Sequence, residues 1–289
     1  MFVKILKVQN LCKKYKDFTL DNVSFSLEQG YIMGFIGVNG AGKTTTIKGI
    51  MNFISRDGGR VELFGREFDK DEIALKQDIA LMMGGSQYYQ RRKIKTITAA
   101  VQPFYSNWDE QAYQHYLKRF DLNPEKKIGE LSQGMTIKYS LTLALSHQAR
   151  LLILDEPTSG LDPAARDDLL ELFQELVESG EKSILFSTHI TSDLEKCADY
   201  ITFIDRGKIV RTATRDDFID AYRLISGASE ELNKLRKDLI SWKIHSFGYQ
   251  ALMENEKWDA AKHPETEIPS LEDIMIFFSK RELLNEKTA

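Results

Sequence analysis

A glycine-rich segment that also carries a lysine and two threonines, GVNGAGKTT, occupies residues 37–45. Glycines let backbone N–H groups surround phosphate oxygens, a lysine can reach the β- and γ-phosphates, and a threonine hydroxyl can ligate Mg²⁺. The residues that this pattern predicts to contact ATP or GTP are Gly37, Asn39, Gly40, Ala41, Gly42, Lys43, Thr44 and Thr45. The segment therefore predicts a nucleotide site, with Lys43 on the terminal phosphates and Thr44 on the metal ion.

Two adjacent carboxylates, Asp155 and Glu156, end the apolar run in LLILDEP. A continuous aliphatic run is typical of a central parallel strand that is buried on both faces, and acids at its end can face a phosphate loop. Asp155 is predicted to hold Mg²⁺ through water, and Glu156 to orient and deprotonate an attacking water molecule. Together with the loop, this pair predicts hydrolysis of a nucleoside triphosphate.

A serine and a glycine stand at the start of a predicted helix in ELSQGM, residues 130–135. A helix start can offer a hydroxyl and backbone N–H groups to a phosphate. A serine there also caps helices without binding anything, so this segment alone leaves both interpretations open. His189, which ends the triplet STH after a strand signal, is equally ambiguous when taken alone.

The chain around these segments alternates between strand and helix signals. An apolar run at 31–37 precedes the phosphate loop, helical apolar spacing follows it, and SILFST and YITFID supply two further strands. Asp162 and Pro163 predict the N-cap and first turn of another helix. We therefore expect an α/β fold with a mostly parallel sheet and right-handed crossovers. The alternation in the first thirty residues predicts an antiparallel β edge layer.

Two regions depart from this pattern. Residues from about 84 to 148 have helical signals and many aromatic side chains, which predicts an inserted helical lobe. Residues 216–289 carry none of the phosphate motifs and have their own strand and helix signals, including a capping box at Ser270 and Asp273. We expect one nucleotide-binding domain over 1–215 and a small C-terminal α/β lobe, which could regulate, dimerise or stabilise the protein.

Bulk composition narrows the class of protein. With 42% apolar and 28% charged residues, the 289-residue chain is expected to be soluble and globular. A net charge of −4 lacks the positive excess of a nucleic-acid binder, so no nucleic-acid partner is expected. Cys12 and Cys197 lack metal or redox spacing, which suits a reducing cytosol. No apolar run is long enough for a spanning helix or a signal core, so a partner must supply any membrane-spanning part.

The ordered set of the phosphate loop, LSQGM, LLILDEP, SGLD and STH resembles the ATPase domain of ATP-binding cassette (ABC) proteins over about residues 2–215. The resemblance implies the P-loop NTPase fold of that family, ATP and Mg²⁺ as ligands, and ATP hydrolysis. In that family two ATPase domains hold two ATP molecules between them, head to tail. Each site then combines the phosphate loop of one subunit with the signature segment of the other.

The same resemblance gives further residues a role at the shared site. Ser132, Gln133 and Gly134 would complete the site of a second ATPase subunit, with a signature that reads LSQGM where LSGGQ is commoner. Asp162 would lie at the dimer seam, and His189 would contact the γ-phosphate and help align Glu156 with water.

Two assignments depend on position alone. Tyr15 matches the aromatic residue on which the family stacks adenine, although it could be an ordinary sheet aromatic. The magnesium-binding glutamine should follow the strand DIALMM, where direct register selects Gly84. We assign this role to Gln87, three residues later.

The interval between Lys43 and Ser132 is too short for the coiled coil of chromosome and repair ATPases, and the translation branch carries two cassettes where this chain has one. The aromatic lobe and the C-terminal extension resemble the ATPase subunits of bacterial ABC-2-type exporters. Closest is the Gram-positive subgroup for export of, or resistance to, peptide antibiotics and other amphipathic compounds. That resemblance implies a separate multispanning membrane permease and a second ATPase subunit, in a homodimer or a heterodimer. It also implies a cytoplasmic location, peripheral on the inner face of the cell membrane.

Other interpretations remain for the activity and for the aromatic lobe. The alternatives to transport are a soluble regulatory or assembly ATPase and a phosphotransferase built on the same loop, which would have no use for the signature segment. Aromatic residues from Tyr88 to Trp108 could form a groove for a short permease helix, or they could be core side chains.

Overall fold

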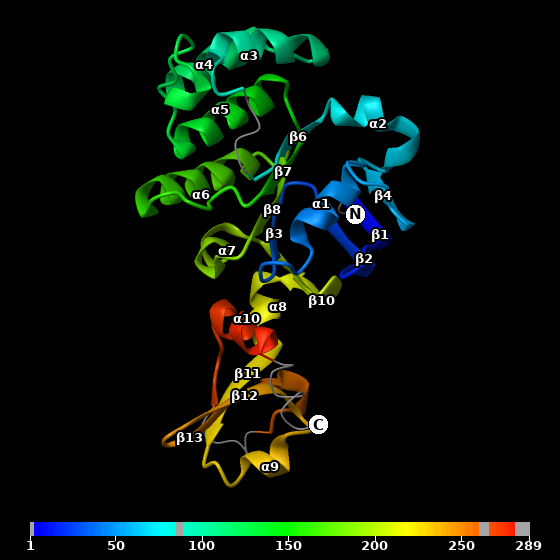
Figure 1. The fold of residues 1–289 in the computed structure, drawn as a ribbon, viewed down its shortest axis with the longest axis vertical. Helices are drawn as coiled ribbons and strands as arrows, with labels where there is room; N and C mark the ends of the chain where they lie inside the picture. The colour runs from blue at the N-terminus through cyan, green and yellow to red at the C-terminus, as the bar shows by residue number, and fades with distance from the viewer. Residues whose placement is uncertain (1–2, 85–88, 260–265, 281–289) are drawn as a thin grey trace.

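A six-stranded, mostly parallel sheet forms the centre of the computed structural model, which describes residues 3–84, 89–259 and 266–280 (Figure 1). In spatial order its strands are β10 (Lys208–Thr214), β9 (Tyr200–Asp205), β3 (Ile32–Ile36), β8 (Ser183–Thr188), β7 (Leu151–Asp155) and β6 (Ile79–Met82). Neighbours from β9 to β6 pair in parallel, and β10 pairs antiparallel with β9 at one edge. This arrangement confirms the expected α/β fold.

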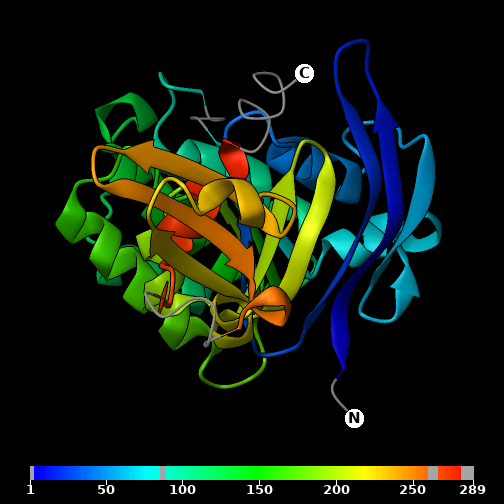
Figure 2. The same cartoon turned by 90° about the horizontal axis from the view of Figure 1, so that it is seen from below.

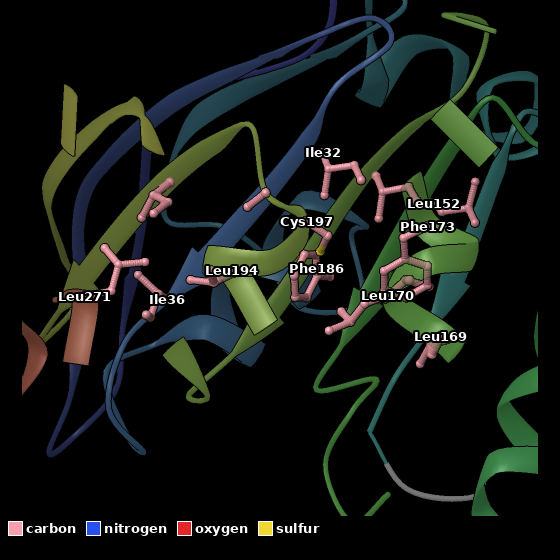
Figure 3. Packing of buried hydrophobic residues seen from close by; sticks show 14 of the residues in the cluster. Ile32, Ile36, Leu152, Leu169, Leu170, Phe173, Phe186, Leu194, Cys197 and Leu271 are labelled. Carbon is pink, nitrogen blue, oxygen red and sulfur yellow. The ribbon is translucent and has the colours of Figure 1, made fainter. Parts of the chain in front are cut away.

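The central strands are apolar along their length because both faces of the sheet are covered. Every residue of β3, β7 and β8 is buried. Along β3, Ile32 and Ile36 belong to one hydrophobic cluster, whereas Met33 and Phe35 belong to another. The helices that contribute to these clusters are α1 (Lys43–Ile50), α5 (Gln133–Ser146), α6 (Pro163–Val177) and α7 (Thr191–Cys197). Helices α5, α6 and α7 pack on the first cluster, and α1 packs on the second. Figure 3 shows the contribution of α6 and α7, with Phe173 and Leu194 labelled.

A four-stranded sheet lies along one side of the molecule, as the blue strands of Figure 2 show. Its strands, in spatial order, are β2 (Thr19–Glu28), β1 (Lys4–Lys14), β4 (Gly58–Leu63) and β5 (Arg66–Glu67), and helix α2 (Phe68–Lys76) follows. All its pairings are antiparallel. Its inward side chains complete the second cluster, so this sheet is the predicted edge layer.

The helices between β6 and β7 gather at one end of the molecule (Figure 1). They are α3 (Ile94–Val101), α4 (Glu110–Arg119) and α5, with 3₁₀ turns at Gln102–Phe104 and Ile128–Glu130. The Thr98 hydroxyl lies 2.9 Å from the Tyr113 hydroxyl and 3.0 Å from that of Tyr139, all three residues being buried. Tyr89 and Phe104, by contrast, are exposed. Part of the aromatic content therefore builds a local core and part faces outward, while Tyr88 lies outside the described residues.

The C-terminal part of the chain forms a third, antiparallel sheet with short helices at the opposite end of the molecule (Figure 1). Its elements are α8 (Arg215–Asp220), β11 (Tyr222–Gly227), α9 (Leu232–Leu235), β12 (Leu239–His245), β13 (Gly248–Glu254), a 3₁₀ turn (Asn255–Lys257), β14 (Thr266–Glu267) and α10 (Leu271–Ser279). Ser270 caps α10: its hydroxyl accepts from the Asp273 N–H, and the Asp273 carboxylate accepts from the Ser270 N–H, both at 3.1 Å. The capping box predicted from the sequence is confirmed.

Helix α10 and strand β11 share a hydrophobic core with the central sheet. Phe203 of β9 lies with its ring centre 5.2 Å from that of Phe278, which in turn lies 5.7 Å from Tyr222. Leu271 belongs to the same cluster as Leu194 of α7 (Figure 3). The C-terminal elements are therefore packed into the main core in addition to their own smaller cluster around β11 and β13.

We expect the Phe278→Ala substitution to lower the free energy of unfolding by about 3 kcal/mol, because it leaves a cavity where two structural units meet. Phe278 is 6% exposed, whereas Phe247, at the turn between β12 and β13, is 96% exposed and provides a matched control. Phe247→Ala should change the stability by less than about 0.5 kcal/mol. Urea unfolding monitored by circular dichroism measures both, and equal effects would contradict a shared core.

The sequence predicted that the chain has no membrane-spanning helix and that its two cysteines are not paired. None of the helices in the described residues combines the length and the apolar character needed to cross a bilayer. Both cysteines, Cys12 and Cys197, are free. Burial raises the pKa of the Cys197 thiol to about 12, so that thiol stays protonated near neutral pH and unreactive.

Candidate active site

Three chain segments meet where neighbouring parallel strands end. Strands β3, β8 and β7 lie side by side, with Ile36 paired to Thr188 and Asp155 paired to Ser187. The segments that follow carry the phosphate loop, His189 and the two carboxylates. Because parallel strands end at the same edge, residues far apart in sequence come together here, which is where open α/β sheets bind ligands.

The phosphate loop joins β3 to α1 through a tight backbone turn. Gly40 and Gly42 have φ values of +83° and +113°, a region that residues with a side chain rarely adopt. Ala41 and Gly42 are buried, Thr44 and Thr45 are half-buried, and Asn39 and Gly40 are exposed. Lys43 is the first residue of α1, and its buried ammonium donates to the Gly37 carbonyl at 2.7 Å. The loop thus encloses its own lysine at a helix N-terminus, where positive potential favours anions.

A hydroxyl from the loop contacts the first carboxylate. Thr44 Oγ1 donates to Asp155 Oδ2 at 2.8 Å, and Asp155 is 4% exposed. Hydroxyl and carboxylate oxygens are hard ligands of the kind that Mg²⁺ selects, usually together with water and phosphate oxygens. In the described residues there is no cluster of three or more His, Cys, Asp and Glu side chains that could hold a metal ion. One hydroxyl and one carboxylate leave the other positions around Mg²⁺ to water and phosphate oxygens, so Thr44 and Asp155 fit an ion bound jointly with a nucleotide.

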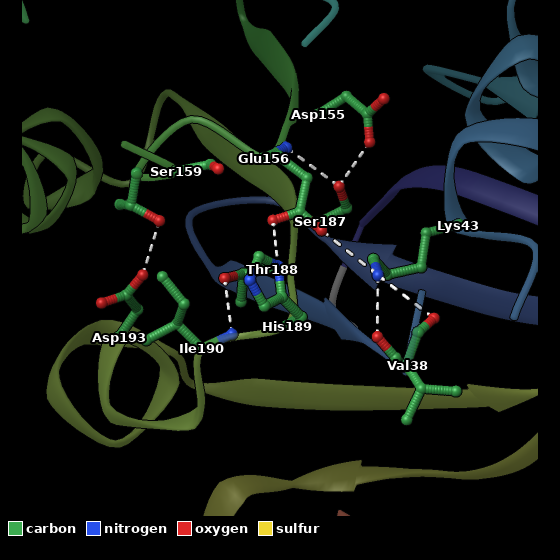
Figure 4. Close-up of polar contacts among 12 residues, drawn as sticks. Val38, Lys43, Asp155, Glu156, Ser159, Ser187, Thr188, His189, Ile190 and Asp193 are labelled. Atoms are coloured by element: carbon green, nitrogen blue, oxygen red, sulfur yellow. Dashed lines mark hydrogen bonds and ion pairs between the residues drawn. The ribbon is translucent and has the colours of Figure 1, made fainter. Parts of the chain in front are cut away.

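The second carboxylate faces both the lysine and the histidine. Glu156 Oε1 lies 3.2 Å from Lys43 Nζ, and Glu156 Oε2 lies 2.8 Å from His189 Nδ1 (Figure 4). Glu156 also has a positive φ of 51°, which is uncommon for a residue with a side chain. A strained backbone at such a position is often found where a side chain must be aimed at a reaction centre.

Ser187 connects the Asp155 carboxylate to the backbone of Glu156. Its hydroxyl donates to Asp155 Oδ1 at 2.5 Å and accepts from the Glu156 N–H at 3.0 Å, while its carbonyl accepts from the same N–H at 3.1 Å (Figure 4). These contacts hold the left-handed turn at Glu156. Sequence reasoning gave His189 a role but not Ser187. The signal in the sequence that could have identified Ser187 is a hydroxyl residue within the apolar strand β8, which pairs with the strand that ends in Asp155.

The signature residues lie at the start of α5. Ser132 is exposed and caps the helix, its hydroxyl accepting from the Met135 N–H at 3.2 Å, so its role as an N-cap is confirmed. The Gln133 side chain donates to the Ser159 carbonyl. Gly134 is half-buried, and a methyl group there would lie 3.6 Å from Leu161. In the described part of the chain, no hydrogen bond joins Ser132 or Gln133 to the phosphate loop of the same chain.

Asp162 has the position predicted from the sequence. Its side chain accepts from the Ala165 N–H at 2.9 Å and caps α6, which begins at Pro163. The residue is exposed, so its carboxylate also faces outward. The SGLD segment therefore forms an open turn between the carboxylate pair and α6.

Tyr15 lies in the loop between β1 and β2, which also contains Phe18. Tyr15 is 43% exposed and its N–H donates to the Phe18 carbonyl at 2.8 Å. A methyl group on Gly42 would lie 2.9 Å from the Phe18 ring, so this loop touches the phosphate loop. Lys13 lies over the Tyr15 ring at 5.7 Å. An exposed ring here could stack on a base.

Gln87 lies outside the described residues. Gly84, which direct register selects, is exposed at the end of β6, where a methyl group would lie 3.5 Å from the Asp155 carbonyl. Beside it is a cavity of about 560 Å³, bounded by β6, the start of α5 and the carboxylate pair, with Met82, Ile137 and Glu156 among its lining residues. The end of β6 therefore approaches the carboxylates.

Comparison with known proteins agrees with this geometry. The family model described as "ABC transporter" matches residues 20–159. The bacitracin transport ATP-binding protein BcrA of Bacillus licheniformis is 32% identical over 212 residues, covering 71% of this chain and 68% of that protein. The choline transport ATP-binding protein OpuBA of Bacillus subtilis (strain 168) is 30% identical over 253 residues, covering 80% and 66%.

A solved structure also matches. It is titled as the structure of an ATP-binding subunit of an ABC transporter, is 27% identical, has a TM-score of 0.66, and the match covers 74% of this chain and 91% of that one. With the phosphate loop and carboxylates arranged as above, the chain binds and hydrolyses ATP. This protein belongs to the ABC transporter family as an ATP-binding subunit.

Proposed function

We propose that this chain is the ATPase subunit of an exporter that moves a peptide antibiotic, toxin or other amphipathic compound through a separate multispanning permease. It would act in the cytoplasm, at the inner face of the cell membrane. The observation that carries the proposal is the convergence of Lys43, Asp155, Glu156 and His189 at one sheet edge in a chain similar to a bacitracin transport protein.

Each residue at that edge has a distinct task in this proposal. The loop N–H groups and Lys43 bind the β- and γ-phosphates and stabilise the charge that develops during transfer. Glu156 orients water and accepts its proton. His189, 2.8 Å from Glu156, contacts the γ-phosphate and keeps the carboxylate aimed at the water. Tyr15 stacks on the adenine.

Thr44 and Asp155 would hold Mg²⁺. Their oxygens are 2.8 Å apart and lie beside the loop that binds the phosphates. Ser187 holds the other oxygen of Asp155, so the carboxylate is already oriented. When bound, Mg²⁺ would neutralise charge on the β- and γ-phosphate oxygens. Gln87 is proposed as a further ligand from the segment after β6.

The site is proposed to be completed by a second ATPase subunit. Ser132 is exposed, and its bonds within the chain run to the start of its own helix. Its hydroxyl and the N–H groups near Gly134 can therefore be offered to the γ-phosphate of a nucleotide on another subunit. Asp162, exposed at the start of α6, would lie at the seam. ATP would then close the dimer, and hydrolysis would reopen it.

Closure of the dimer would drive the permease. The cavity between β6 and α5 is lined mainly by apolar side chains, including Met82, Leu131 and Ile137, and Glu156 lines it as well. The exposed Tyr89 and Phe104 lie on the helical part of the same half of the molecule. A short amphipathic permease helix docked in this region would be placed next to the catalytic carboxylate.

Similarity to OpuBA favours a second candidate function, the transport of choline or a related cation. The two functions differ in what the partner permease carries, so a transport assay separates them. A chain that acts without any permease, as a soluble regulatory or assembly ATPase, is the third outcome.

The experiment is to purify the tagged chain from native membranes, identify any multispanning protein that accompanies it, and produce both in cells that lack them. We expect the pair to raise survival in bacitracin, and the same pair with Glu156→Gln not to do so. Choline uptake should be unchanged. Raised choline uptake without bacitracin protection would replace the exporter proposal with the second candidate. Recovery of soluble proteins alone would favour the third outcome.

A further inference from the structure

A buried carboxylate, Asp193, lies outside the group formed by Lys43, Asp155, Glu156 and His189. It contacts chain segments that follow Glu156 and His189. Asp193 of α7 is 1% exposed and follows His189 by four residues. Its Oδ2 accepts from the Thr158 hydroxyl at 2.6 Å. Thr158 is fully buried and follows Glu156 by two residues. Asp193 therefore links the segment after Glu156 to the helix that follows His189.

The other oxygen of Asp193 faces α6. Arg166 Nε lies 3.9 Å from Asp193 Oδ1, and both atoms are buried without a hydrogen-bond partner in the described part of the chain. Arg166 donates its backbone N–H to the Asp162 carbonyl, in the first turn of α6. Opposite charges at this distance attract each other, although the pair is too far apart to hydrogen-bond. The attraction ties the start of α6 to the same carboxylate.

Burying a carboxylate with one unpaired oxygen is costly, so a structural explanation of Asp193 is incomplete. Burial raises its pKa, which the Thr158 hydroxyl and the Arg166 charge oppose, and the charges of Glu156 and His189 also act on it. An uncharged residue of similar size would avoid that cost. The carboxylate instead lies where three functional segments can be held in one arrangement.

We propose that Asp193 is a positioning residue for ATP hydrolysis, which sets the relative placement of Glu156, His189 and the SGLD turn through Thr158 and Arg166. It touches neither the phosphate loop nor Lys43, whose contacts are with Gly37, Val38 and Glu156. Its loss therefore changes the rate of the chemical step and leaves the binding of ATP intact.

The test measures kcat and KM for ATP on the full chain, with thermal unfolding of each variant. Asp193→Asn keeps the shape and an acceptor for Thr158 but removes the charge that faces Arg166. We expect kcat to fall about tenfold with KM unchanged. Thr142→Val is the matched control, because Thr142 is a fully buried threonine whose hydroxyl donates within α5 to the Lys138 carbonyl. The control should keep the kcat of the unmodified protein.

Thr158 supplies a second pair of variants if Asp193→Asn does not fold. Thr158→Val removes the hydroxyl and should lower kcat, whereas Thr158→Ser restores the hydroxyl and should recover most of the loss. In the double variant Asp193→Asn with Thr158→Val, the two effects should be less than additive because the two side chains are in contact and hold the same segments in place. The proposal is overturned by an unchanged kcat in Asp193→Asn or by equal rates in the two Thr158 variants. A fall in kcat that Thr142→Val shares would also overturn it.

Discussion

Replacing Glu156 with glutamine is expected to lower kcat by about 10²–10⁴-fold and to leave the affinity for ATP close to that of the unmodified protein. Glutamine keeps the shape of the side chain but cannot accept a proton from water. The phosphate loop keeps its lysine, so ATP still binds. With binding intact and hydrolysis blocked, the proposed dimer should accumulate in its closed form.

Single-turnover hydrolysis measures the loss of the chemical step, and gel filtration in ATP measures the accumulation of the closed dimer. Glu125→Gln is the matched control, because Glu125 is an exposed carboxylate whose ion pairs are with Lys93 and Lys95 and not with the residues of the site. It should hydrolyse ATP normally. Near-normal hydrolysis by Glu156→Gln would remove Glu156 from the role of general base.

Lys43→Met and Ser132→Arg are each expected to lose hydrolysis by at least about 100-fold, and an equal mixture of the two is expected to regain it. Lys43→Met removes the positive charge that binds the phosphates. Ser132→Arg blocks the surface that completes another subunit's site. A mixed dimer has one doubly damaged site and one intact site. If chains exchange at random, about a quarter of the sites in the mixture are intact.

The control mixes Lys43→Met with a chain that carries both substitutions, because no combination of these two contains an intact site. Fluorescence energy transfer between labelled subunits measures the exchange of chains. An absence of recovered hydrolysis in a sample whose chains do exchange would contradict a site shared between two copies of this chain. Full hydrolysis by Ser132→Arg alone would place the complete site within one chain.

The parts of the fold that depend on local pattern could be predicted from the sequence. The buried strands β7 and β8 appeared as apolar runs, and the caps at Asp162 and Ser270 were evident from residue type and spacing. Apolar runs and helix caps can be recognised in a sequence because each depends on only a few neighbouring residues. The alternation of strand and helix also predicted a mostly parallel sheet, and in such a sheet the strand ends that precede Lys43, Glu156 and His189 lie at one edge.

Contacts that depend on pairing across the fold could not be predicted in this way. Ser187 reaches Asp155 because β8 happens to lie beside β7 in a particular register. Asp193 and Thr158 are 35 residues apart in the sequence, and they form a hydrogen bond because α7 packs against the turn after β7. A serine in a strand and an aspartate in a helix have many ordinary explanations, and only tertiary packing selects between them.

The joint core of Phe203, Tyr222 and Phe278 has a consequence for how this protein can evolve. A larger or smaller side chain on β9 would leave a clash or a gap against α10, because close-packed interiors tolerate volume changes poorly unless a neighbour compensates. These positions are therefore constrained to vary together. The C-terminal elements cannot be exchanged as an independent module; they have to diverge in step with the sheet that carries the ATPase residues.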